Sequence, residues 1–315
     1  MGKSKDSERK IEQVKKPRSL ESTTSRIAAA VLIWMLLQMP FQVGDRLPEL
    51  LQPPIQYAVW LLLFLVPLTL LLGKPPHNVE VHRLHHSSGE IICWVLIEWG
   101  IAELLSCTFE FVGLNQMFHQ SFFLVMDDSI WAGIWFFMFS VLMEEFVFRG
   151  YICRYLAPYN RTLAVLLSAY LFAGVHGNPV QIIDAFLFGI VTGYVYLETG
   201  NLIYPYLMHF LSNLCSNFAF TWYQRYFQGG EDTFLVLKVA IALCVLLIAL
   251  LVLTKITRKN GCLGPVSFCK RVVQSIAVSK KEYREGFFSP GMIWVHLLFL
   301  ILLTNALVSV VLVVR

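Results

Sequence analysis

Apolar residues in this chain gather into long continuous runs instead of short alternating patches. Nine runs occur, near residues 27–43, 57–73, 91–108, 129–155, 162–177, 181–198, 201–220, 234–254 and 291–313. Several are close to the roughly 20 residues that an α-helix needs to cross the hydrocarbon core of a bilayer. The pattern therefore predicts an all-α, polytopic membrane helix bundle with eight or nine transmembrane helices, the count depending on the short fifth run.

Composition supports a membrane protein and gives no sign of a nucleic-acid partner. Of the 315 residues, 57% are hydrophobic and 15% charged. The mean hydropathy is +0.62, which ordinary soluble domains of this size do not reach. The net charge of +4 comes from loops and the N-terminal segment, where basic residues report topology. The expected partners are the lipid bilayer and membrane-anchored protein, and no nucleic acid is expected.

The first 26 residues contain eight Lys or Arg residues and show no apolar periodicity. They are predicted to form a basic, disordered cytoplasmic tail (1–26) before a single bundle (27–315). With nine helices, Lys and Arg fall on alternate loops, which places the N-terminus in the cytoplasm. The protein is expected in the plasma (inner) membrane of a bacterium or an organelle membrane of a eukaryote. An interfacial amphipathic helix is predicted at about 265–285 on the cytoplasmic surface.

The fourth apolar run carries charged residues at membrane depth: Glu144, Glu145 and Arg149. A charged group at the bilayer centre costs roughly 3 kcal/mol on insertion scales, so such residues pair or face a wet cavity. Glu145 and Arg149 stand at i, i+4 and can form an ion pair on one helix face. Glu144 points about 100° away from that face. A structural ion pair explains Glu145 and Arg149 but leaves Glu144 without a partner.

His176 is the first candidate partner for Glu144. A turn at Ala157–Asn160 would fold the fourth and fifth runs into a hairpin, because Pro158 and Asn160 interrupt the apolar pattern. Glu144 and His176 lie at similar distances from that turn along their helices, so they can meet across the hairpin. A single histidine near a helix end is otherwise more often structural.

The seventh run supplies further polar residues. His209 and Asn213 stand at i, i+4, and Ser212, Ser216 and Asn217 extend the same polar stripe. Such a stripe either makes interhelical hydrogen bonds or forms the wall of a wet cavity.

Two other polar groups have alternative interpretations. Glu98 and Glu103 in the third run either balance Arg149 or line the same cavity. His82, His85 and His86 belong to a solvated loop or bind a metal; no carboxylate or cysteine stands with them at a recognised ligand spacing.

The order Glu144-Glu145-x-x-x-Arg149, Phe172-x-x-x-His176 and His209-x-x-x-Asn213 on successive helices resembles the CPBP (Abi) family. That family comprises intramembrane proteases, among them the type II CAAX prenyl endopeptidases, and bacterial proteins linked to bacteriocin processing and self-immunity. Each motif alone is weak, but three in order within 70 residues are specific. The resemblance covers about residues 129–220, the expected catalytic core.

The resemblance implies a glutamate-type endopeptidase that acts on a membrane-associated or lipidated protein. Glu144 and His176 would activate a water molecule, His209 and Asn213 would hold the oxyanion, and Glu145 with Arg149 would support them. No cofactor is expected, with zinc the alternative. After His176 the chain continues with Gly-Asn-Pro instead of further histidines, which favours the broad family over CAAX processing. The competing functions are a non-proteolytic scaffold or immunity protein and a transporter with a proton relay.

Overall fold

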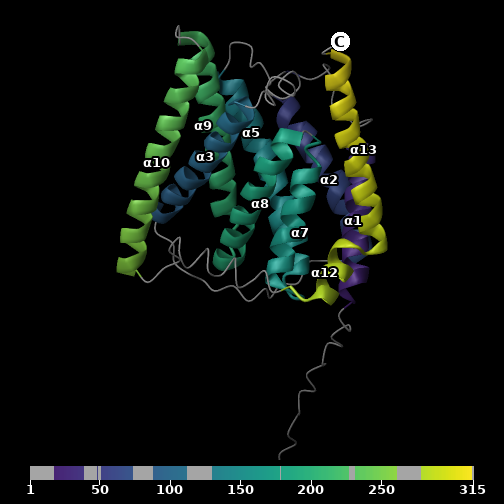
Figure 1. The fold of residues 1–315 in the computed structure, drawn as a ribbon. Coiled ribbons are helices and arrows are strands. Elements are labelled where there is room, and N and C mark those ends of the chain that lie inside the picture. The colour runs from purple at the N-terminus through teal and green to yellow at the C-terminus, as the bar shows by residue number, and fades with distance from the viewer. Residues whose placement is uncertain are drawn as a thin grey trace, which may run out of the picture.

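The computed structural model describes residues 18–38, 48, 51–73, 88–111, 130–177, 179–226, 231–260 and 278–313, and these form helices and short connections (Figure 1). The elements are α1 (Leu20–Gln38), α2 (Gln52–Leu72), α3 (Ser88–Phe111), α5 (Ile130–Glu145), the π-helix η2 (Phe146–Cys153), α6 (Arg154–Leu156), α7 (Arg161–Gly174), α8 (Pro179–Thr199), α9 (Ile203–Tyr226), α10 (Glu231–Asn260), α12 (Lys280–Phe287) and α13 (Pro290–Val313). Each predicted apolar run coincides with a helical stretch. The prediction of an all-α membrane bundle is confirmed.

Within the described residues, six helices are long and apolar enough to cross a membrane: α1, α2, α3, α8, α10 and α13. Helix α7 is apolar but shorter. The remaining apolar stretches are α9 and the continuous α5–η2–α6 segment, whose middle contains the charged residues. The number of membrane crossings, eight or nine, stays a prediction.

Helix α1 begins at Leu20, before the predicted end of the tail at residue 26. Ser19 accepts a hydrogen bond from the Ser22 amide at 3.2 Å, as a helix N-cap does. The polar residues of this first part make interhelical contacts: the Thr24 hydroxyl donates to the Glu285 carbonyl at 3.0 Å, and Arg26 donates to the Leu71 carbonyl at 2.7 Å. Apolar periodicity could not reveal a helix that packs through hydroxyl and guanidinium groups.

Basic residues gather at one end of the bundle. Figure 1 shows the start of α1, the end of α10 and helix α12 at this end, and the C-terminal end of α13 at the other. Hydrogen bonds tie the α6–α7 turn to the same end, since the Tyr159 hydroxyl donates to the Arg18 carbonyl at 2.8 Å. The described basic residues here are Arg18, Arg26, Arg154, Arg161, Lys255, Arg258, Lys280, Lys281 and Arg284. The positive-inside rule assigns this end to the cytoplasm, and that orientation stays a prediction.

Two further predictions concern residues outside the described ranges. The loop histidines His82, His85 and His86 lie there, and so does most of the amphipathic segment 265–285. Its last residues fall in α12, which begins with a capping box between Ser279 and Glu282.

The fourth and fifth runs form the expected hairpin. The chain turns at residues 157–160, and Asn160 caps α7 by accepting hydrogen bonds from the amides of Thr162 and Leu163. Helix α8 returns against α7 with very close backbone approach: a Cβ added at Gly189 would lie 2.9 Å from the Ala169 Cα. Glycine at 189 is therefore required by packing, as its GxxxG spacing with Gly193 suggests.

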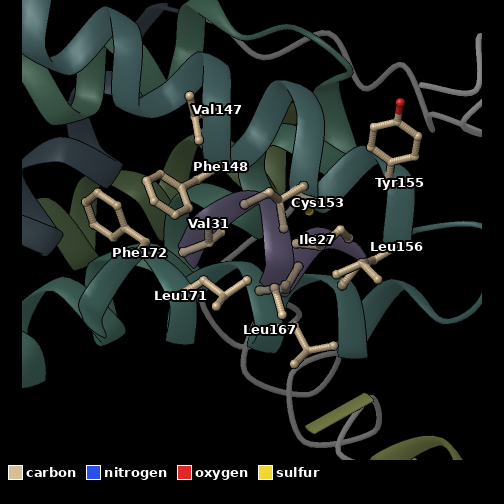
Figure 2. Close-up of a cluster of buried hydrophobic side chains, with 14 of the residues drawn as sticks. Ile27, Val31, Val147, Phe148, Cys153, Tyr155, Leu156, Leu167, Leu171 and Phe172 are labelled. Atoms are coloured by element: carbon tan, nitrogen blue, oxygen red, sulfur yellow. The ribbon is translucent and has the colours of Figure 1, made fainter. Parts of the chain in front are cut away.

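The main hydrophobic core lies where α1, η2 and α7 meet. Figure 2 shows Ile27 and Val31 of α1 beside Phe148 of η2 and Leu171 and Phe172 of α7. All five side chains are buried, and the Phe148 and Phe172 rings meet edge to face at 5.2 Å. This packing fixes the π-helix, which carries Arg149, and the C-terminal half of α7, which carries Phe172 and leads into His176.

Candidate functional site

The charged motif lies where the α-helix α5 passes into the π-helix η2. Glu144 and Glu145 end α5, and Arg149 stands in the middle of η2. A π-helix widens the turn and is often found at functional sites. The apolar pattern predicted one uninterrupted α-helix here. A buried apolar run contains the same residue types whether its backbone is an α-helix or a π-helix, so the sequence does not distinguish the two.

Arg149 is fully buried and has several partners. Its Nη1 donates to Glu145 Oε1 at 3.0 Å, which confirms the predicted i, i+4 ion pair. Its Nη2 donates to the Thr192 hydroxyl of α8 at 2.5 Å. The guanidinium carbon lies 4.4 Å from the ring centroid of Phe172, a cation–π distance. Arg149 thus joins η2, α7 and α8 in the bundle interior.

His209 of α9 lies between the two glutamates. Its Nδ1 is 2.8 Å from Glu145 Oε1, and its Nε2 is 3.7 Å from Glu144 Oε2. The predicted Glu145–Arg149 pair is therefore part of a larger cluster, in which the His209 imidazole also lies near the Glu144 carboxylate. This contact joins residues more than 60 positions apart, and sequence spacing gave no signal for it.

The two glutamates differ in exposure. The Glu145 side chain is 1% exposed and that of Glu144 is 22% exposed. Tyr57 of α2 is a further neighbour of Glu144. Its side chain hydrogen-bonds to Ser140, one turn before Glu144, and interacts electrostatically with the Glu144 carboxylate. Tyr57 was not predicted as a site residue, because a tyrosine in an apolar run is not distinctive in the sequence.

His176 lies just after α7, close to the cluster but not directly bonded to Glu144. Within the described part of the chain, its Nδ1 pairs with the Phe172 carbonyl at 2.7 Å, and no hydrogen bond or ion pair joins it to Glu144. The Phe172 ring lies 4.8 Å from the His176 ring and 5.6 Å from the His209 ring. Phe172 thus sets the spacing of the two imidazoles.

Asn213 stands one turn after His209 on α9 and is partly exposed. The side chains of Ser216 and Asn217, further along the predicted polar stripe, lie outside the described set. The structure therefore brings Glu144, Glu145, Arg149 and His209 into one cluster. His176 lies nearby in the turn after α7, and Asn213 lies one turn after His209 on α9.

The other acids of the third run do not balance Arg149. Glu98 hydrogen-bonds to Ser212 of α9, and Glu103 pairs with Lys238 of α10 at 3.9 Å. In the parts of the chain that the structure describes, no group of three or more His, Cys, Asp or Glu residues is placed to hold a metal ion.

Comparison with known proteins supports the family relation. Residues 126–215 match the model of the Rce1-like family, type II CAAX prenyl endopeptidase Rce1-like. The match contains all seven motif residues and nearly all of the expected core at 129–220. No curated protein and no solved structure matches the chain.

The chain is thus related to the CPBP (Abi) intramembrane proteases, the class that its motifs suggested. The matched family is one of peptidases, and the surrounding apolar helices make this chain an integral membrane protein. The matching family model is that of the CAAX-type branch. The Gly-Asn-Pro sequence after His176 had instead favoured the broad CPBP family over CAAX processing.

Proposed function

We propose that this protein is an intramembrane endopeptidase in which Glu144 and His176 activate a water molecule. The observation that carries the proposal is the difference between the adjacent glutamates. Glu145 is enclosed and holds Arg149 and His209 at 3.0 and 2.8 Å, whereas Glu144 keeps a 22% exposed carboxylate near the same imidazole. Glu144 is therefore the carboxylate with room for water, and Glu145 is a positioning residue.

His176 suits the role of orienting that water. In the neutral imidazole one nitrogen is a donor and the other an acceptor. The Phe172 carbonyl can only accept, so His176 Nδ1 carries the hydrogen and Nε2 is left as an acceptor. The water would donate one hydrogen to His176 Nε2 and give its second proton to Glu144 as its oxygen attacks the peptide carbon.

His209 and Asn213 suit the stabilisation of the oxyanion. Glu145 accepts from His209 Nδ1 and fixes the ring, which points Nε2 toward Glu144. An imidazolium at His209 would balance the two carboxylates and Arg149, giving a cluster with no net charge, and its Nε2–H would donate to the oxyanion beside the Asn213 amide. Glu144 would then return its proton to the departing amine, which completes hydrolysis.

A membrane-anchored protein is the substrate class that fits this site. The cluster lies among helices long enough to cross a bilayer, so a lipid-anchored or transmembrane chain can reach it laterally. The family match makes a prenylated C-terminal tail the first such substrate to examine.

The proposal is tested by comparing protein termini in membrane fractions of cells that express the wild type or the Glu144→Gln variant. Glutamine keeps the size of the side chain but cannot take a proton from water. We expect new termini that occur with the wild type and decrease at least about 100-fold with the variant. Equal termini in the two samples would contradict proteolysis and favour a scaffold function.

A further inference from the structure

A second group of acidic and polar side chains, called here the acidic group, lies beside the proposed active site. It is formed by Glu98 of α3, Asp184 of α8 and Ser212 of α9. Glu98 hydrogen-bonds to Ser212 and interacts electrostatically with Asp184. The three residues come from three different helices, and none belongs to the motifs of the matched family. The proposed mechanism uses none of them.

The acidic group adjoins the catalytic cluster through two helices. Ser212 stands one turn after His209 on α9, and Asp184 stands one turn before Phe188, whose ring lies 4.7 Å from the His209 ring. Asp184 also interacts electrostatically with His209. A substrate bound across Glu144 would therefore place a neighbouring residue near Glu98 and Asp184.

This acidic group contains an unsatisfied buried acceptor. Glu98 is only 6% exposed, and its Oε2 has no hydrogen-bond partner in the described part of the chain. A buried carboxylate oxygen without a donor is costly, and such atoms are rare in native structures. Asp184, by contrast, is partly exposed.

The two nearby cations among the described residues, Lys238 and Arg149, are engaged elsewhere. Lys238 lies 3.2 Å from Glu110 and 3.9 Å from Glu103, further along α3. Arg149 is enclosed by Glu145 and Thr192. Two carboxylates at membrane depth need either protons or a cation, because buried charges are paired in folded proteins. A cation that the substrate brings would satisfy both carboxylates and the orphaned oxygen.

We propose that Glu98 and Asp184 form a specificity pocket for a basic side chain, arginine or lysine, close to the bond that is cleaved. A guanidinium is the better fit, since its planar fork can donate to two carboxylates at once. This inference rests on the proposed function for its role in cleavage, while the binding of the cation does not depend on that function.

Binding is measured with two short lipidated probes that differ by one atom. One is dodecanoyl-glycyl-arginine amide, and the other carries citrulline, in which an oxygen replaces an NH₂ group and the charge is lost. Each is titrated against the purified full-length protein in zwitterionic lipid nanodiscs, with empty nanodiscs subtracted. We expect the arginine probe to bind at least about tenfold more tightly than the citrulline probe. A charge-assisted hydrogen bond contributes enough binding free energy for a difference of that size.

The variants Glu98→Gln and Asp184→Asn should each reduce that preference to about twofold or less while leaving citrulline binding unchanged. Glu110→Gln is the matched control: it removes one negative charge from the same helix about 18 Å from Glu98, and it should keep the preference. Equal binding of the two probes to the wild type would overturn the proposal, as would a preference that survives both pocket variants. Because no cleavage is measured, this failure is distinct from failure of the proposed protease activity.

Discussion

Replacing Glu145 by glutamine removes the negative charge that compensates Arg149. The Arg149 side chain is 0% exposed, and Glu145 Oε1 is its carboxylate partner at 3.0 Å. Thr192 remains as a neutral acceptor and Phe172 as a ring face, but neither carries a formal charge. Breaking a buried ion pair by removing one partner costs about 3 to 5 kcal/mol, because it leaves an uncompensated buried charge. The variant should therefore lose that much free energy of unfolding.

The same reasoning predicts a rescue. In the double variant Glu145→Gln/Arg149→Met, the buried charge is gone, Met fills the space beside Phe172, and the Gln oxygen can still accept from His209. Replacing a buried ion pair by neutral groups of similar size is often close to neutral in stability. We expect the double variant to regain most of the free energy that the single variant loses.

Unfolding by SDS in mixed micelles, together with the yield of monodisperse protein after mild extraction, measures both effects. Glu110→Gln serves as the control, since it breaks a partly exposed pair with Lys238 that is worth at most about 1 kcal/mol. If Glu145→Gln unfolds like this control, Arg149 does not depend on Glu145 and the account of the cluster is wrong. A double variant no more stable than the single one would contradict the charge argument specifically.

Two further predictions concern the bundle as a whole. Cysteines introduced at Arg18 and at Lys281 should both resist an impermeant thiol reagent added to intact cells, because the basic end of the bundle is expected in the cytoplasm; labelling of either from outside would reverse the orientation. Gly189→Ala should lower the free energy of unfolding by about 1 to 3 kcal/mol, since the new Cβ would lie 2.9 Å from the Ala169 backbone. Gly193→Ala should cost less in the same SDS titration, because the atoms nearest to its Cβ would belong to the Val165 side chain, at 3.1 Å, and not to the backbone.

Local patterns predicted much of the fold. Each apolar run became a helix because burial in lipid requires backbone hydrogen bonds to be satisfied within the segment. The turn at 157–160 followed from Pro158 and Asn160, and Asn160 indeed caps the next helix. The Glu145–Arg149 pair followed from i, i+4 spacing alone. These features depend on residues close together in sequence.

Features that depend on distant residues were not predictable in this way. The bond between His209 and Glu145 depends on how α9 packs against α5, and spacing does not encode that packing. The π-helix after Glu145 lies in an apolar run whose residue types are compatible with either an α-helix or a π-helix. The contact of Glu98 with Ser212 likewise required the placement of α3 beside α9. The early start of α1 was missed because its first turns pack through polar groups.

The most direct test of the glutamate mechanism is the cleavage rate of a confirmed membrane-anchored substrate by purified, reconstituted protein. We expect Glu144→Gln to fold and extract like the wild type but to cleave at least about 100-fold more slowly, because the side chain that accepts the proton of water is gone. Substantial cleavage by Glu144→Gln, alongside a well-folded but inactive Glu145→Gln, would contradict the account and assign the base to Glu145.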